Sequence, residues 1–332
     1  MKKTLFCLTV LTAALVSCQK NEMPASEEVQ GIPMTLTASL PGESGTKTTV
    51  SPDGTGLKST WDAEESISVV TLDGEGKLLF VDTFTSSGTA GRTNAEFEGT
   101  FTGGKSPAKV IVIYPALEET GGFYRTPAYK AYDGRSYSLL SNASIGSYVF
   151  SATDNQPLRQ ASDGDFAHFK NYCVMTGNVN LTDIQNDKLT VTLRNLTTVF
   201  KIVAMFPESC KGKGLSQIII TSCEDSGATH RNIFSGVGGT AVDMEKCGYN
   251  PEGNRKYDWF IYSSFTVPDS GVTTFYMPVI GMDGAKNERE DRWFMMADLD
   301  VGDVVLLARK EFEKDVTYEA GKMYTVNVTF SK

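Results

Sequence analysis

Cys18 is the residue whose type and position point most directly to chemistry. It ends a stretch in which Lys2 and Lys3 carry positive charge and residues 5–16 are mostly apolar. This order predicts a secretory signal over residues 1–17, because the apolar part is shorter than the roughly 20 residues that span a bilayer. A thiolate is a strong nucleophile, so a cysteine at the cut is suited to covalent modification. We therefore expect the chain from Cys18 onward to be exported.

The four residues Leu15-Val16-Ser17-Cys18 resemble the lipobox of bacterial lipoproteins. The resemblance implies that the sulfur of Cys18 carries a diacylglycerol, that the chain is cut before it, and that the new amino terminus is acylated. Several acyl chains give lasting membrane attachment, whereas one chain binds only marginally. An ordinary cleaved signal with a chance cysteine is the alternative.

Residues 18–31 are polar and acidic and show no period, which predicts a lipidated tether. An acidic stretch after the lipidated cysteine resembles the surface-export signals of some Gram-negative lipoproteins. We therefore expect a lipid-anchored protein of the outer membrane, displayed at the cell surface. The periplasmic face of that membrane is the rival location.

Composition argues against several classes of function. The formal net charge of -9 disfavours a nucleic-acid partner, because phosphate binding needs a basic face. His168 and His230 are the only histidines, and no G-x-S-x-G elbow is present. His168 lies between aromatic residues, which is more typical of a packed or capping residue than of a catalytic base. We expect no enzymatic activity, no cofactor and no metal site.

Four cysteines remain once Cys7 leaves with the signal and Cys18 takes the lipid: Cys173, Cys210, Cys223 and Cys247. They allow three full pairings, among which sequence cannot choose. An exported protein can form disulfides, and no C-x-x-C spacing favours zinc. Disulfides and buried free thiols stay equal alternatives.

Alternating patterns predict an all-β fold. Residues 32–40 alternate apolar and polar side chains, and residues 110–114 are continuously apolar, as in a central strand. Asp73-Gly74 between apolar runs predicts a hairpin. Residues 166–178 are weakly β, and 183–186 or 297–302 could each hold one helical turn.

Strand patterns resume near residue 188, after a polar segment. With turns every ~8–12 residues, this predicts two β-sandwich domains, 32–185 and 186–332. The last strand is the clearest, because four apolar residues alternate with Thr325, Asn327 and Thr329: Tyr324, Val326, Val328 and Phe330.

Three stretches resemble the fimbrillin family, the lipoprotein precursors of type V pilus subunits with their tip and anchor relatives. The first is the lipobox followed by a strand with Leu36-Thr37-Ala38. The second is Gly45-Thr46-Lys47-Thr48 followed by a Trp-x-x-Gly-Asp-x-Ile-x-Val pattern over residues 61–69, in which Glu64-Glu65 replaces Gly-Asp. The third, residues 318–328, is similar to a closing Tyr-x-x-Gly-x-x-Tyr-x-x-x-Val strand.

The resemblance implies transthyretin-like topology in both domains and a structural or adhesive role as pilus stalk, tip or anchor. It also implies other pilus subunits as partners, which add a strand to the groove left by the removed first strand. Candidate residues of this exchange lie on the first and last strands: Ile32, Met34, Leu36, Leu40, Tyr324, Val326, Val328 and Phe330. If the last strand completes a sheet of its own chain, it cannot act as a donor strand. If it is held loosely, it can act as the donor strand for the next subunit.

Lys47 is the candidate processing site. Major pilins are cut after an arginine that follows the first strand, but this chain has no arginine between Cys18 and Arg92. A trypsin-like cut after Lys47 would free residues 18–47 and place the protein in the fimbrium. If Lys47 is only a solvated loop residue, the protein stays lipid-anchored. It is then an anchor, or a non-polymerising surface lipoprotein that binds glycans or host proteins.

Overall fold

The computed structural model describes residues 31–40, 51–53, 56–58, 60–76, 78–88, 90–104, 106–120, 123–125, 147–149, 158–225, 230–232, 241–243, 248–250, 259–263, 265–280, 293–301, 304–311 and 316–331. All of them belong to one compact unit, Gly31–Lys332. Strands dominate these residues, so the expected all-β class is confirmed. The described helices are short 3-10 segments: η2 (Ala167–Tyr172), η3 (Leu181–Asn186) and η4 (Glu208–Cys210). Within the described ranges no helix has the length and apolar character to cross a membrane.

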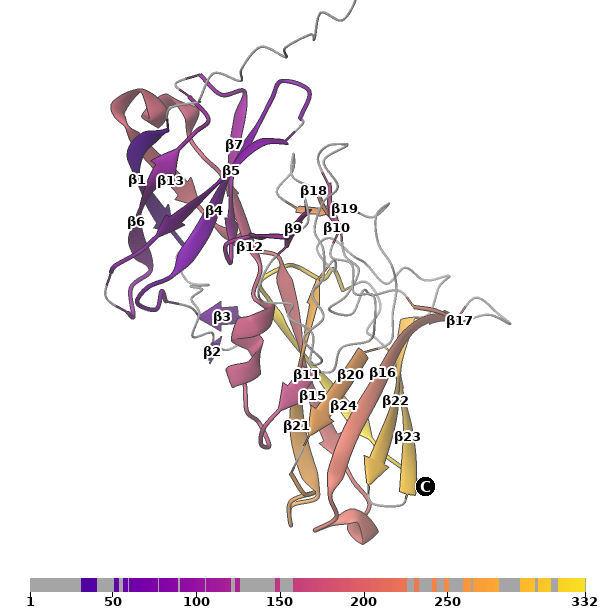
Figure 1. Cartoon of the computed structure of the whole chain (residues 1–332). Coiled ribbons are helices and arrows are strands. Elements are labelled where there is room, and N and C mark those ends of the chain that lie inside the picture. The colour runs from indigo at the N-terminus through magenta and orange to yellow at the C-terminus, as the bar shows by residue number, and fades with distance from the viewer. Residues whose placement is uncertain are drawn as a thin grey trace, which may run out of the picture. The chain divides into compact units, whose positions relative to one another are not determined.

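The largest sheet has eight strands (Figure 1). Its order in space is β13 (Lys188–Thr192), β1 (Ile32–Ser39), β6 (Asn94–Phe101), β5 (Leu78–Thr85), β4 (Ser66–Leu72), β7 (Lys109–Tyr114), β12 (Met175–Asn178) and β14 (Arg194–Asn195). The expected hairpin is β4–β5, whose turn is closed by a hydrogen bond of 3.1 Å from Gly76 N to Asp73 O.

This sheet curls until its ends almost meet. Its two outer strands, β13 and β14, follow each other directly in sequence, so the chain passes from one end of the sheet to the other within a few residues. β14 pairs with β12, and an isolated bridge joins Val179 to Val191 of β13. Gly177 lies at this seam. A Cβ atom there would stand 2.5 Å from Thr192 O and 2.6 Å from Val191 Cγ2. The close approach of the strands therefore requires glycine.

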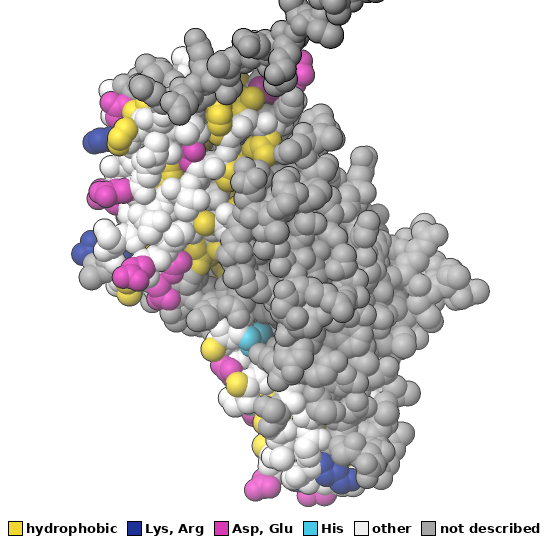
Figure 2. Space-filling model, viewed as in Figure 1, with side chains coloured by type: hydrophobic (Ala, Val, Ile, Leu, Met, Phe, Trp, Pro, Cys, Tyr) yellow, Lys and Arg dark blue, Asp and Glu magenta, His cyan; other side chains and the backbone are white. Residues whose placement is uncertain are grey.

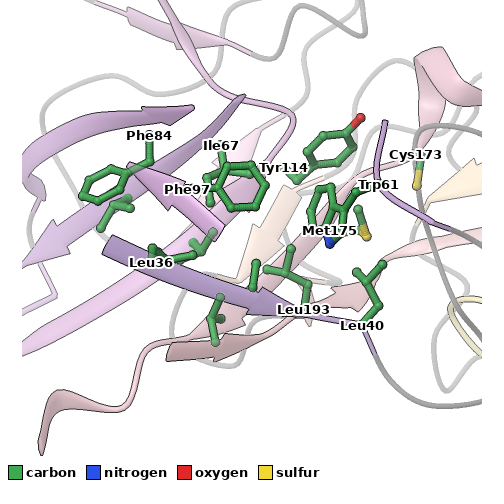
Figure 3. Close-up of a cluster of buried hydrophobic side chains, with 14 of the residues drawn as sticks. Leu36, Leu40, Trp61, Ile67, Phe84, Phe97, Tyr114, Cys173, Met175 and Leu193 are labelled. Carbon is green, nitrogen blue, oxygen red and sulfur yellow. The ribbon is translucent and has the colours of Figure 1, made fainter. Parts of the chain in front are cut away.

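One hydrophobic cluster fills the interior of the curled sheet. Trp61 belongs to this cluster, with its ring centroid 5.1 Å from that of Phe97 and 5.5 Å from that of Tyr114, both in edge-to-face contacts (Figure 3). The Trp61 backbone is pinned by hydrogen bonds to Arg92 O and from Gly91 N, 2.8 and 2.7 Å long. Apolar burial on this scale is the main favourable term in folding.

Two further sheets are built mostly from the carboxyl-terminal half. One contains β11 (Leu158–Gln160), β20 (Trp259–Ser263), β16 (Leu215–Asp225), β22 (Trp293–Val301) and β23 (Val304–Glu311), with β17 (His230–Asn232) on β16. The other contains β21 (Val272–Ile280), β15 (Thr197–Met205) and β24 (Met323–Thr329). Smaller sheets contain β10 (Ser147–Val149), β18 (Ala241–Asp243) and β19 (Gly248–Asn250); β2 (Ser51–Asp53) and β3 (Gly56–Lys58); and β8 (Glu118–Thr120) and β9 (Phe123–Arg125).

Some local expectations differ from the structure. The expected helical turn at 183–186 is present in η3, but residues 297–301 belong to strand β22. The weakly β stretch 166–178 begins as helix η2 and becomes a strand only at β12. β13 and β14 follow residue 185 in sequence and yet pair in the first sheet. The division into domains at 185/186 stays a prediction.

Candidate functional site

Strand β1 carries the first group of candidate exchange residues, and it is an interior strand of its sheet. It pairs antiparallel with β6 along its whole length, from Ile32 opposite Phe101 to Ser39 opposite Asn94. On its other side it pairs in parallel with β13, from Thr35 opposite Lys188 to Ser39 opposite Thr192. Both edges of β1 are therefore paired over Thr35–Ser39, and the β6 edge is paired over the whole strand. We call the strip between β6 and β13 that β1 occupies the β1 seat.

The inward side chains of β1 enter the hydrophobic cluster. Met34, Leu36, Ala38 and Leu40 are at most 5% exposed, and Leu36 and Ala38 are completely buried. Ile32 is partly buried and packs against the same cluster. Leu36 lies on the same side of the strand as Phe97 and Ile67 in Figure 3. The strict alternation in the sequence is thus the alternation between core and surface.

The walls of the β1 seat are apolar on the same inner face. β6 contributes Phe97 and Phe101, and β13 contributes Leu189 and Val191, all at most 4% exposed. Without β1, these side chains and two rows of backbone groups would lose their partners. A strand that enters this seat must supply both an apolar face and two ladders of hydrogen bonds.

The carboxyl end of β1 is held by hydrogen bonds beyond the regular ladders. Leu40 N donates to Thr93 O over 3.2 Å, and Leu193 N donates to Ser39 O over 2.9 Å. The Ser39 hydroxyl also donates to Val191 O over 3.2 Å. β1 is therefore anchored most firmly at its carboxyl end, which precedes Lys47 in sequence by eight residues.

The outward face of β1 is polar and lies beside two hollows. One, of about 500 Å³, is lined by hydroxyl and amide groups with a single apolar side chain: Thr37, Ser39, Asn178, Asn180, Thr190, Val191 and Thr192. The other, of about 410 Å³, also has charged side chains in its lining, which consists of Thr37, Ser87, Gly88, Arg92, Asn94, Ala95, Glu96 and Glu98. Over the part of the molecule that holds this sheet, the space-filling view shows mostly uncharged side chains with separate acidic and basic ones (Figure 2).

Strand β24 carries the second group of candidate residues, and it completes a sheet of its own chain. It pairs in parallel with β15, from Met323 opposite Val199 to Thr329 opposite Met205. Val326, Val328 and Phe330 are at most 7% exposed. The Tyr324 hydroxyl accepts from Glu319 N over 2.9 Å and donates to Thr317 O over 3.3 Å. β24 can act as a donor only after it leaves these contacts.

Cys18 and Lys47 lie outside the described residues, so lipidation and processing at these positions stay predictions. The cysteine alternatives are resolved in part, because Cys173 and Cys210 are buried free thiols. Burial raises the pKa of Cys173 to about 12, which keeps this thiol protonated and unreactive. The side chains of Cys223 and Cys247 are outside the described part of the chain.

His168 is a packed residue of helix η2, as its aromatic neighbours suggested. Its Nε2 hydrogen-bonds the carbonyl oxygen of Tyr276 over 2.9 Å, and its Nδ1 is buried with no hydrogen-bond partner among the described residues. Burial lowers the pKa of His168 below its usual 6.5, partly opposed by the Tyr276 carbonyl. The neutral imidazole is therefore the form that the fold accommodates.

We expect acid to weaken the fold through His168. The unfolded histidine binds a proton near pH 6.5, whereas the folded one binds it only at lower pH. The stability that this residue contributes is thus complete above pH 6.5 and is lost as pH falls below it, by at most about 1.4 kcal/mol per unit. His168→Gln keeps an N–H donor for Tyr276 and does not titrate. Urea unfolding at pH 7.5 and 5.5 should show a smaller loss for this variant; an equal loss would contradict the assignment.

Sequence patterns identified β1 and β13 as strands but missed that they are neighbours. Parallel partners are not joined by a short turn, so no local signal marks them. The residues of β13 that line the β1 seat, Leu189 and Val191, were therefore not among the candidate exchange residues. Their alternation with Thr190 and Thr192 matches that of β1 and was the only available signal.

Comparisons with known proteins give structural likenesses only. No protein-family model matches the chain, and no curated protein matches it. A candidate cell adhesion protein of Bacteroides eggerthii is 16% identical, covering 91% of this chain and 87% of that chain, with a TM-score of 0.37. A candidate cell adhesion protein of Bacteroides ovatus is 9% identical, covering 90% of this chain and 92% of that chain, with a TM-score of 0.43. One of Bacteroides uniformis is 12% identical, covering 90% of this chain and 96% of that chain, with a TM-score of 0.42. No residue of this chain takes its role from these likenesses.

Proposed function

We propose that this chain is an exported lipoprotein of the fimbrillin type, which acts at the cell surface as a structural or adhesive subunit. In this proposal Cys18 carries the lipid, and β1 is a strand that a strand of another subunit can replace. A cut after Lys47 moves the protein from the outer membrane into a fimbrium. Two domains of transthyretin-like topology belong to the same proposal.

The position of β1 is the observation that supports this function best. β1 is the first described strand, it fills a seat between β6 and β13, and its inner face consists of Met34, Leu36, Ala38 and Leu40. Once the chain is cut after residue 40, only non-covalent contacts hold it. Its seat is then a site for strand addition with a defined length and register.

An incoming strand must meet a specific pattern. It needs small or apolar side chains at alternate positions, opposite Phe101, Gly99, Phe97 and Ala95 of β6. It also needs backbone groups in register with both neighbours. β24 has the required alternation, but it is paired to β15. Its use as a donor requires it to leave β15, or a different segment must donate.

The test is the amino terminus of the protein on intact cells, read by mass spectrometry. The proposal expects a terminus at Thr48, with complexes that resist denaturing gels without boiling. Lys47→Gln should retain the acylated terminus at Cys18 and prevent these complexes. If wild-type molecules all keep an acylated Cys18 and run as monomers, strand exchange after this cut is ruled out.

The hollow beside Thr37 favours a second candidate function, a non-polymerising surface lipoprotein that binds glycans. Its lining is neutral and consists mainly of hydroxyl and amide groups, which suit sugar hydroxyls. Thr37→Val combined with Asn178→Ala should abolish retention of a glycan that the wild-type protein binds. Binding that survives both substitutions would eliminate this hollow as the site.

A further inference from the structure

Ala38 is the one small side chain on the inner face of β1. The other inward residues of this face are Ile32, Met34, Leu36 and Leu40. Ala38 is completely buried, and it has a strand partner on each side, Ala95 of β6 and Val191 of β13. Val191 is itself only 4% exposed. What lies over Ala38 therefore decides which side chain this part of the β1 seat accepts.

The side chain of Trp61 covers the inner face of the seat at this place. Trp61 forms an isolated bridge with Arg92, and its backbone N donates to Arg92 O. Its ring reaches Phe97, with the two centroids 5.1 Å apart. Ala95 lies between Arg92 and Phe97 along the chain and shares the inner face with Phe97. The indole therefore passes over Ala95, and Figure 3 shows it between Phe97 and Leu40.

The place of Met34 is built differently. Met34 lies opposite Gly99 of β6, and the pairing of β1 with β13 begins only at Thr35, so Met34 has a strand partner on one side. The space above Gly99 is filled by Phe84, because a Cβ atom on Gly99 would stand 2.6 Å from Phe84 Cγ. The seat thus holds a long, unbranched side chain beside Gly99 and only a methyl group beneath the indole.

The inner face of β1 presents side chains in the order large, large, small, large at residues 34, 36, 38 and 40. We propose that the β1 seat selects the replacing strand by this order, and that this strand belongs to a different protein and has a residue no larger than alanine at the place of Ala38. A larger side chain there pushes against the indole and Val191, and a packed core resists even one added methylene. The proposal rests on the proposed function and states which partner strand exchange requires.

β24 of a second copy does not have this order. The apolar residues of its alternation are Tyr324, Val326, Val328 and Phe330. When these four fill the seat, a valine stands at the place of Ala38 in either strand direction. A shift that brings Ala320 to this place puts Lys322 at the buried place of Leu40 in one direction and of Leu36 in the other. A buried, unpaired lysine is more costly than the added bulk of valine.

Two other strands of this chain share the order, and both are held inside their sheets. Phe200, Ile202, Ala204 and Phe206 repeat it in β15 and the residue after it, and Trp293, Met295, Ala297 and Leu299 repeat it in β22. Each of these strands lies between two neighbours. β1 of a second copy also has the order, but the proposed cut after Lys47 separates it from its own chain, so it cannot join two copies. A strand of a different protein is the occupant that fits.

The first test measures urea unfolding of the uncut, full-length chain. Ala38→Leu should lower the equilibrium constant for folding by about 5- to 150-fold, the effect of added bulk in a packed core. Ala38→Val should act in the same direction and serves if the leucine variant does not fold. Ile32→Phe enlarges a partly buried residue of the same strand, and should change the constant by less than about fivefold.

A Trp61→Phe background shows whether the indole sets the size limit. The smaller ring leaves room over Ala38, so the effect of Ala38→Leu should shrink when both changes are combined. An unchanged effect overturns the role of the indole. An Ala38→Leu chain, or an Ala38→Val chain in its place, that loses no more stability than the Ile32→Phe chain overturns the size selection itself.

The second test measures exchange, in a full-length chain that has a specific protease site in place of residues 42–47 and is cut after folding. A labelled peptide of residues 31–40 should replace the cut β1 segment, as followed by anisotropy. Its Ala38→Leu variant and a peptide of residues 322–331 should bind about 5- to 150-fold more weakly. The Ile32→Phe peptide is the matched control and should bind like the unchanged peptide.

The two tests separate failure of the selection from failure of the proposed function. If the unchanged peptide does not enter the cut chain, strand exchange at this seat is wrong, and urea unfolding of the uncut chain still decides the size limit. If the unchanged peptide enters and the Ala38→Leu or 322–331 peptide enters equally well, exchange stands and the selection is overturned. Entry of only the unchanged and Ile32→Phe peptides supports a partner strand with a small residue at this place.

Discussion

A chain that begins at residue 41 is expected to remain unfolded alone and to fold when a peptide of residues 31–40 is added. β1 supplies four inward side chains to the hydrophobic cluster and pairs with two strands. Its absence exposes Phe97 and Leu189 and leaves two strand edges open, so the remaining sheet cannot close. The peptide restores the apolar face and both ladders at once.

Two peptide variants separate the inner face of β1 from its outer face. Leu36→Asp introduces a carboxylate where the side chain is fully buried, and should weaken binding at least about 100-fold. Thr37→Asp introduces a carboxylate one residue later, on the outer face opposite Glu96, and should weaken binding by no more than about five-fold, the effect of one like-charge pair across strands. Anisotropy of a labelled peptide and circular dichroism of the chain measure both. Equal binding of the two variants, or folding without a peptide, would contradict the role assigned to β1.

Trp61→Ala is expected to lower the free energy of unfolding by about 3–5 kcal/mol, a large part of the 5–15 kcal/mol typical of a folded protein. Trp61 is 1% exposed and contacts both Phe97 and Tyr114 edge-to-face. Its removal leaves a cavity at the centre of the curled sheet. The surrounding strands are fixed by their hydrogen bonds and can collapse only partly into that space.

Trp61→Phe is the matched control. It keeps an aromatic ring in the cluster and removes Nε1, which is buried without a hydrogen-bond partner among the described residues. We expect a loss below about 1.5 kcal/mol, because part of the lost packing is offset by the removal of an unsatisfied polar group. Urea unfolding measures both variants. A loss from Trp61→Phe as large as that from Trp61→Ala would show that the indole itself, and not aromatic burial, is required.

The segment that begins at Trp61 could be identified from the sequence, including its departure from the family pattern. The Trp-x-x-Gly-Asp-x-Ile-x-Val resemblance singled out the segment, and the departure from it was visible at Glu64-Glu65. The structure gives that departure a physical meaning, since Glu64 has a φ of 62°, in the left-handed region that favours glycine. The residue usual in the resembling pattern is therefore the one that the backbone prefers.

The hydrogen bonds that Gln160, Asp163 and His168 make to the backbone of β21 were beyond sequence reasoning for a different reason. Gln160, Asp163 and His168 act on β21, more than 100 residues later in the chain. Nothing in the local pattern of residues 158–178 indicates which strand they reach. Side chains that bond to backbone groups of a distant strand leave no periodic signal.

By itself the sequence determined the all-β class, the limits of β1, β7 and β24 to within one residue, and the face of β1 and β24 that is buried. These follow from alternation at a period of two, which depends only on neighbouring residues. The tertiary structure alone decided that β1 lies between β6 and β13, that the sheet closes at Gly177, and that Gln160, Asp163 and His168 bond to the backbone of β21. Parallel partners and edge contacts join segments far apart in the chain, and their register depends on packing that no local pattern records.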